Sequence, residues 1–192
     1  MIGKKTLVIL GISLIAFILV TAGAFAFRPG SILQLSNLKK CQNCNLSSAD
    51  LTGLDLSEAE LQGANMSGAN FATTNLGGAN LTNADLAGAK LSNVNLGGAN
   101  LTSANLTGAS LIKANLTGAD LTDANLTNAK LTDARLSNAN LTNANLTGAR
   151  MNYAVLRDAN LTNAKLTGAR MDGVTWLDGT MCKEGSVGEC RQ

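Results

Sequence analysis

The sequence of 192 residues contains no histidine. Its absence removes the most common general base, the most common metal ligand and any Ser-His-Asp arrangement. The Asp and Glu side chains are scattered along the chain rather than paired for acid–base chemistry. No glycine-rich phosphate loop lies between an expected strand and an expected helix. We therefore expect no enzyme, no cofactor and no metal site.

Proline and aromatic residues are also scarce, with one Pro and 3% Phe, Trp and Tyr. This is little for the core of an ordinary globular domain. The large apolar residues instead follow a strict period. From Leu46 to Trp176 one occurs at every fifth position, 27 times in all, and 22 of these residues are Leu. Two positions before each stands a small residue, which is Ala in 22 cases. An internal repeat therefore organises most of the chain.

A period of five matches neither the 3.6 residues of a helical turn nor the 2.0 of a strand. If the Leu side chains share one core, the backbone must turn once in every unit, and Gly or Asn in the last place of many units eases that turn. Four five-residue sides then make a coil of 20 residues, and successive coils stack about 4.8 Å apart. Asn residues stacked at this interval are expected to form hydrogen-bonded ladders. The pattern predicts an all-β solenoid.

The repeating unit reads Ala-(Asn/Asp)-Leu-(Thr/Ser)-(Gly/Asn), as in residues 104–108. It resembles the pentapeptide-repeat family, and its 27 units run in one register without an insertion. The resemblance implies a right-handed quadrilateral β-helix, which we expect over residues 45–178.

Residues 1–26 have the features of an export signal. Lys4 and Lys5 precede an apolar run, and Ala26 closes an Ala-x-Ala cleavage candidate. Cleavage there predicts a secreted protein. Retention of the uncharged residues 6–27 predicts a membrane anchor instead, because this stretch is long enough to span a bilayer. Both interpretations send the repeat across the cytoplasmic or thylakoid membrane into the periplasm, lumen or extracellular space. Contact with the membrane is expected only through this segment.

A stack of leucines has open apolar ends that need caps. We expect residues 27–44 to form a linker and an N-terminal cap with a short helix. We expect residues 179–192 to form a C-terminal cap, with Met171, Trp176 and Met181 closing the far end of the column.

Two cysteine pairs lie in these caps, Cys41 with Cys44 and Cys182 with Cys190. A c-type haem site would need a His after Cys44, and a thioredoxin-like redox pair would need a βαβ pattern nearby. A four-cysteine zinc site would have to join opposite ends of the column. In an oxidising compartment we expect two local disulfides, whereas free thiols would reopen a metal or redox role for the first pair. The combination of a CxxC opening with a C-terminal Cys loop resembles exported pentapeptide-repeat proteins of photosynthetic bacteria.

Residues 20 apart are expected to lie directly above one another, and one outward row is basic. This row contains Lys90, Lys130, Arg150 and Arg170, with Lys113 on the same face. Like charges on neighbouring rungs repel unless something anionic meets them. The row is therefore either a contact for an acidic protein, a polysaccharide or a lipid head group, or a solvated face that keeps the column soluble.

These observations predict an exported, non-enzymatic structural or protein-interaction module that presents a rigid surface to an unidentified protein or envelope partner. An alternative is an envelope or anionic-polymer binding module that acts through the basic face. A DNA mimic that modulates topoisomerases is a third hypothesis, but such a mimic needs a cytoplasmic, strongly acidic rod. Without residues 1–26 the chain has 13 basic and 13 acidic residues. We therefore expect no nucleic-acid partner, and the sequence predicts no particular oligomeric state.

Overall fold

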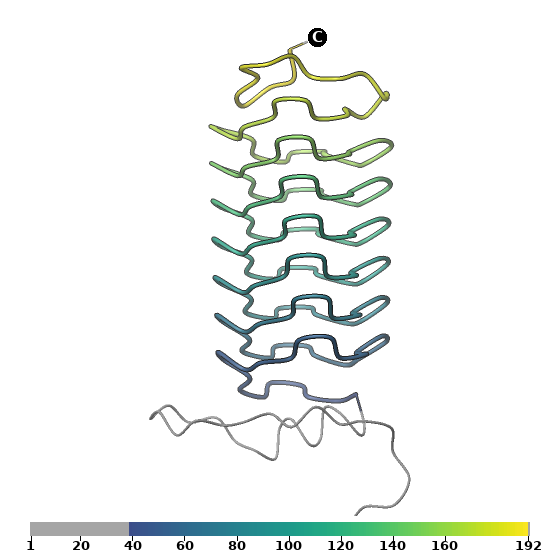
Figure 1. Ribbon diagram of the computed structural model, residues 1–192, viewed down its shortest axis with the longest axis vertical. Coiled ribbons are helices and arrows are strands. Elements are labelled where there is room, and N and C mark those ends of the chain that lie inside the picture. Colours follow the sequence, from purple (N-terminus) through teal and green to yellow (C-terminus); the bar gives the residue numbers. More distant parts are fainter. Residues whose placement is uncertain (1–38, 192) are drawn as a thin grey trace, which may run out of the picture.

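The computed structural model describes residues 39–191, which form one column of stacked coils (Figure 1). Parallel β-bridges join residues 20 apart, from the pair of Lys40 and Glu60 to the pair of Val155 and Thr175. One bridge falls in each five-residue unit, so four bridges belong to each coil. Within residues 39–191 the bridges are isolated, and no extended strand or helix is present. The predicted repeat β-solenoid is confirmed.

The backbone satisfies its polar groups by pairing between coils. In the unit around Leu121, the Leu N–H donates to the Asn140 carbonyl in the next coil (2.7 Å). The Asn125 N–H donates to the Ala104 carbonyl in the previous coil (2.9 Å), and the Ala124 N–H closes a turn onto Leu121 (3.0 Å). Because this pattern recurs along the column, each short unit is bonded to both neighbouring coils.

The interior of the column is filled by the repeated apolar side chains. Every large residue of the register from Leu61 to Leu146 is fully buried, including Met66 and Phe71. Nearly all the small residues of the same stretch are buried beside them. Burial of one Leu side chain contributes about 1.5–3 kcal/mol before entropy is counted. The column therefore forms a core with very few aromatic residues.

The last residue of each unit from Asn43 to Gly173 adopts a left-handed backbone conformation. Its φ is 67° at Gly118 and 58° at Asp123, and similar values recur along the repeat. Glycine adopts this conformation without strain and asparagine tolerates it, which explains why these residues are so frequent there. Thr73 (φ 59°) and Tyr153 (φ 61°) are exceptions, because β-branched and bulky residues are rare in this region.

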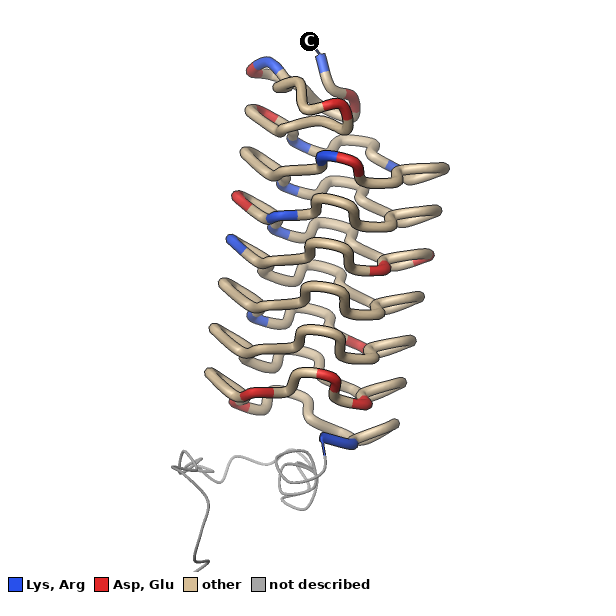
Figure 2. Tube along the Cα trace, turned by 90° about the vertical axis from the view of Figure 1, so that its right-hand side faces the viewer, with Lys and Arg blue, Asp and Glu red and all other residues tan. Residues whose placement is uncertain are grey.

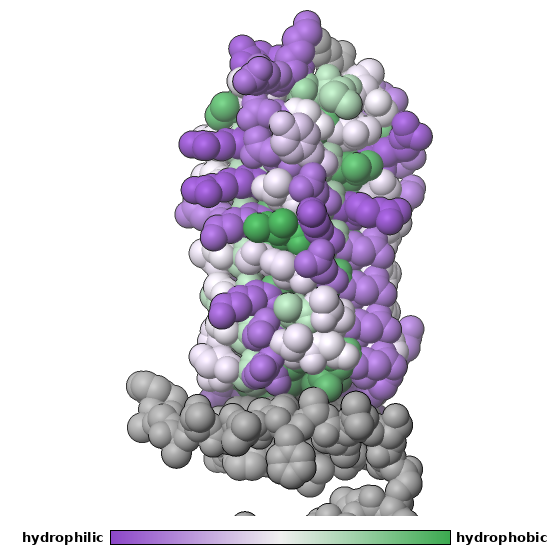
Figure 3. Space-filling model, viewed as in Figure 1, coloured by the Kyte–Doolittle hydropathy of each residue, from purple (hydrophilic) through white to green (hydrophobic). Residues whose placement is uncertain are grey.

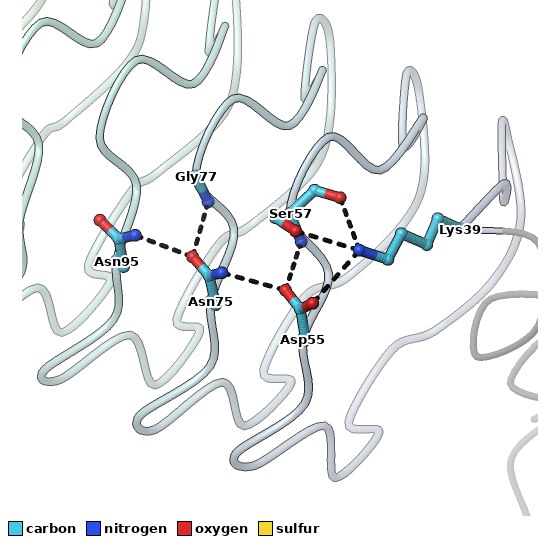
Figure 4. Close-up of polar contacts among 6 residues, drawn as sticks. All are labelled: Lys39, Asp55, Ser57, Asn75, Gly77 and Asn95. Atoms are coloured by element: carbon cyan, nitrogen blue, oxygen red, sulfur yellow. Dashed lines mark hydrogen bonds and ion pairs between the residues drawn. The ribbon is translucent and has the colours of Figure 1, made fainter. Parts of the chain in front are cut away.

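Asparagine side chains form the expected ladders on the outer surface. Asn95 Nδ2 donates to Asn75 Oδ1 (2.8 Å), and Asn75 Nδ2 donates to Asp55 Oδ1 (3.0 Å) (Figure 4). These two oxygens also accept the backbone N–H groups of Gly77 and Ser57. An amide both donates and accepts hydrogen bonds, whereas a carboxylate only accepts them. Asp therefore fits the end of the ladder that receives hydrogen bonds from the amides and has none to donate. The same arrangement occurs at Asp50, Asp85, Asp120 and Asp123.

Asp55 is also the end of the ladder that lies nearest to Lys39. Hydrogen bonds from the Ser57 side chain and backbone, and then the positive charge of Lys39, lower the pKa of Asp55 from 3.8 to about 2. Lys39 Nζ lies 3.4 Å from Asp55 Oδ2. The acceptor end of this ladder therefore stays ionised at physiological pH, and its stabilising contribution is lost progressively as the pH falls from 3.8 through about 2.

The residues after the repeat fold back over the last coil as a C-terminal cap. Antiparallel bridges pair Arg170 with Val187 and Thr175 with Met181. A disulfide joins Cys182 to Cys190 within this cap. The cap is therefore stapled to itself and hydrogen-bonded to the last coil.

The cap leaves part of this end uncovered, which differs from the expected closure. Met171 is buried, but Trp176 is only partly buried and Met181 is 68% exposed. Leu161 and Leu166 are also partly exposed, unlike the leucines in the coils below. The physical reason is that the cap pairs with Arg170 and Thr175 of the last coil, so it does not cover these two leucines.

The signal or anchor expected in residues 1–26 or 6–27 lies outside the described residues, as does the short helix expected before Lys39. In the part of the chain that the structure describes, no helix has the length and apolarity needed to cross a bilayer. The first described coil contains a disulfide between Cys41 and Cys44.

Candidate functional site: a cationic face of the column

Between residues 41 and 178 the chain has eight Lys and Arg residues, and five of them lie on one side of the column, which we call the cationic face. Bridges link its stacked positions in the order Asp50, Asn70, Lys90, Ser110, Lys130, Arg150 and Arg170. The structure thus stacks Lys90, Lys130, Arg150 and Arg170, which we call the cationic row. The last three lie on consecutive coils, about 4.8 Å apart.

The side chains of the cationic row are exposed and form no ion pair within 4.0 Å in residues 39–191. Ion pairs in residues 39–191 join Lys39 to Asp55 and Lys40 to Glu60, both at the N-terminal end. Lys113 is exposed on the same face. Stacked like charges destabilise neighbouring rungs. The fold therefore tolerates a repulsion between stacked positive charges, and an anionic partner would reduce this repulsion.

Charge is distributed unevenly along the column (Figure 2). No Lys or Arg occurs between residues 41 and 89, where the acidic residues are Asp50, Asp55, Glu58, Glu60 and Asp85. Half a coil away from the cationic row, the opposite row from residue 60 to residue 160 has no basic residue at the stacked positions. Positive charge is therefore concentrated on one face and toward the C-terminal end.

The rest of the surface offers little that is apolar. In the view of Figure 3 hydrophilic side chains dominate, and hydrophobic residues appear as small separate patches. Exposed large apolar side chains in residues 39–191 are Tyr153, Met181 and Val187, all near the C-terminal end.

The chemistry of the cationic face suits anion binding. Arg150 and Arg170 each present a planar guanidinium that can form paired hydrogen bonds with a carboxylate, sulfate or phosphate. All four cysteines are paired in disulfides, so none offers a free thiol. Within residues 39–191 no group of three His, Cys, Asp or Glu side chains is placed to hold a metal ion.

A second feature of this face was missed by the sequence analysis. A cleft of about 500 Å³ lies beside Tyr153, between the last coils and the cap. The signal that might have revealed it is the tyrosine itself, because it stands in the last place of a unit, where Gly and Asn are usual. The cap that forms the other wall has no repeat pattern, so its position was not predictable.

Comparisons with known proteins agree on the repeat. The family model described as pentapeptide repeats (8 copies) matches residues 40–78, 64–102, 79–118, 99–138 and 139–175. No curated protein matches the chain.

Similar solved structures include two cyanobacterial proteins. One is HetL from Nostoc sp. strain PCC 7120, a pentapeptide repeat protein involved in heterocyst differentiation regulation. It has 25% identity and a TM-score of 0.28, over 81% of this chain and 100% of that chain. The other is Rfr23 from Cyanothece 51142, with 27% identity and a TM-score of 0.41, over 77% of this chain and 97% of that chain.

A third similar structure is QnrB1, a plasmid-mediated fluoroquinolone resistance protein. It has 21% identity and a TM-score of 0.41, over 70% of this chain and 78% of that chain.

Proposed function

Because this chain belongs to the pentapeptide-repeat family, whose members are generally structural or interaction modules, we propose that it is an exported, non-enzymatic module that binds an anionic partner through its cationic face. In this proposal the column has the right-handed quadrilateral form that the family implies. The stacked core makes it a rigid support on which the cationic row keeps a constant spacing.

The observation that carries this proposal is the exposed, unpaired state of the cationic row. Lys130, Arg150 and Arg170 follow one another on consecutive coils. Their nearest acidic neighbours on the face, Asp133 and Asp172, form no ion pair with them within 4.0 Å. Such a row attracts an anionic partner over the Debye length, which is about 8 Å at physiological salt.

A second candidate function is binding to an anionic polymer of the cell envelope. The regular spacing of the row favours it, because a polymer repeats its charges along its length. Mimicry of DNA is the weakest candidate, since this face is cationic while a DNA mimic presents carboxylates. Within residues 39–191 there are 12 basic and 13 acidic residues, and the acidic ones form no continuous row.

The first test neutralises the row. We expect the double variant Arg150→Gln/Arg170→Gln to bind immobilised dextran sulfate about tenfold more weakly than the unmodified chain, because two charge contacts are lost. Binding of the unmodified chain is expected to weaken steeply as salt is raised from 50 to about 300 mM. Affinity is measured by surface plasmon resonance or microscale thermophoresis, with neutral dextran as the reference surface.

The matched control is Arg135→Gln/Lys165→Gln. It removes the same net charge from the same coils, but from the other faces of the column. Equal weakening by both double variants would show that only net charge matters, and the cationic face would then not be the binding surface.

The export component has its own test. When the full chain is produced in a bacterium, we expect a soluble species outside the cytoplasm. Its intact mass should match a chain that starts at Phe27, and this mass should not increase on thiol alkylation. A full-length species in the membrane fraction would identify the anchored form instead. A full-length cytoplasmic species with alkylated cysteines would contradict export.

A further inference from the structure

The cleft beside Tyr153 has an unusual composition for this column. Its walls are formed by Asn152 and Tyr153 from one coil, by Asp172 and Gly173 from the next, and by residues 181–184 of the cap, which include Lys183 and Glu184. Most of the repeat surface is Thr, Ser, Asn and Gly. The cleft instead combines an aromatic ring with polar groups at the end of the cationic row.

Tyr153 occupies a position that does not favour it. Its φ of 61° lies in the left-handed region, where a bulky side chain is strained. The side chain is nevertheless 62% exposed, so burial offsets little of this strain. The ring lies against the backbone of Gly173, where an added Cβ would come within 2.5 Å of the ring. One flat ring is thus held on the surface, against a glycine that leaves room for it.

The polar groups next to the ring are fixed in place. Asp172 Oδ2 accepts a hydrogen bond from Asn152 Nδ2 (2.7 Å), and Asp172 Oδ1 accepts one from the Gly185 N–H in the cap (2.5 Å). The pair therefore presents an amide and a carboxylate whose directions are set by the cap and the coil. Arg150 and Arg170 precede Asn152 and Asp172 by two residues on the same face.

We propose that this cleft binds one sugar residue of an anionic polysaccharide. The apolar face of the sugar ring stacks on Tyr153, its hydroxyl groups hydrogen-bond with Asn152 and Asp172, and its carboxylate or sulfate pairs with Arg150 or Arg170. Asp172 and Glu184 repel an anion placed directly against them, so the sugar must place hydroxyls there and its charge on the arginines. A peptide anchor would need an enclosed apolar pocket, whereas this cleft is open and has an amide and carboxylates on its walls.

This inference rests on the proposed function for its anionic contact and adds a specific class of ligand to it. The experiment therefore uses two polyanions, polygalacturonate, which is built of sugar rings, and polyacrylate, which has carboxylates without rings. The full chain is compared with Tyr153→Gly, and melting temperatures are measured for each variant. The control Thr73→Gly makes a similar change at the same place of a distant unit.

We expect Tyr153→Gly to bind polygalacturonate about tenfold more weakly and polyacrylate with unchanged affinity. Its melting temperature should be equal to or higher than that of the unmodified chain, as for Thr73→Gly, because glycine relieves the left-handed strain. Arg150→Gln/Arg170→Gln should weaken binding of both polymers.

Three results would overturn the inference. One is unchanged affinity of Tyr153→Gly for polygalacturonate, and another is an equal loss for both polymers. The third is a fall in melting temperature without selective loss of sugar binding, which would assign the ring to packing. If the unmodified chain binds neither polymer, the proposed anion contact is wrong as well. If it binds both polymers and Tyr153→Gly changes neither affinity, only the sugar site is wrong.

Discussion

A chain in which Leu121 is replaced by Asp is expected to melt at least about 10 °C below the unmodified protein, or not to fold at all. The Leu121 side chain is 0% exposed in the middle of the column. The substitution removes about 1.5–3 kcal/mol of apolar burial and places a carboxylate where desolvation costs several kcal/mol more. Together these terms approach the whole stability of a typical domain, about 5–15 kcal/mol.

The measurement is a thermal melt followed by circular dichroism, with Asn128→Asp as the matched control. Asn128 lies in the same coil but is exposed, and its left-handed backbone conformation is one that Asp123 and Asp133 also adopt. The control introduces the same charge in the same coil and should change the melting temperature by only a few degrees. Similar melting temperatures for the two variants would contradict the assignment of Leu121 to the core.

The damage from Leu121→Asp should also be local. In a solenoid each coil contacts only its neighbours, so stability is approximately a sum of coil and interface contributions. Where the variant still folds, we expect hydrogen exchange to accelerate most at the amides of Leu101 and Leu141, one coil away on either side. The amide of Leu61, three coils away, should change least.

The second large effect is expected at the C-terminal cap. Replacement of Cys182 and Cys190 by Ala removes a cross-link that spans eight positions, which stabilises by about 2–3 kcal/mol in the loop-entropy estimate. The cap is otherwise held by a few backbone hydrogen bonds, including those from Met171 to Ser186 and from Gly173 to Cys182. We therefore expect the cap to detach while the column stays folded.

Native-state hydrogen exchange tests this expectation. The amides of Met171, Gly173 and Gly188 donate hydrogen bonds between cap and column, and they should lose protection in the variant. The corresponding variant at Cys41 and Cys44 should leave these three amides unchanged, because that disulfide lies at the other end. Retained protection of all three amides would show that the hydrogen bonds alone hold the cap.

The repeat was predictable from the sequence because a single physical requirement acts at every fifth residue. Leu121 and Ala124 are buried for the same reason as their counterparts in each other coil, so the period predicted the stacking of the cationic row. The cap was not predictable, since residues 179–191 carry no repeat and their path depends on which coil edge they meet. Tyr153 was missed for a related reason, because the wall opposite its ring belongs to that cap.

The direction of the ladders was also not predicted. The period shows that Asn75 and Asn95 stack, but not which amide donates. The position of Asp55 at the accepting end becomes meaningful only once the direction is known, and it then explains why an acid can end a ladder without leaving an unpaired donor.

The four units in each coil impose two different rules on changes in chain length. Insertion of one five-residue unit leaves every Leu facing inward, so the fold accepts it. The same insertion turns everything beyond it by a quarter of a revolution relative to everything before it. Placed between Lys130 and Arg150, it would send the two arginines to an adjacent side and divide the cationic row. Only insertions of 20 residues preserve both the core and the alignment of the surface rows. The fold therefore accepts insertions of five residues, whereas the cationic row stays continuous only with insertions of 20.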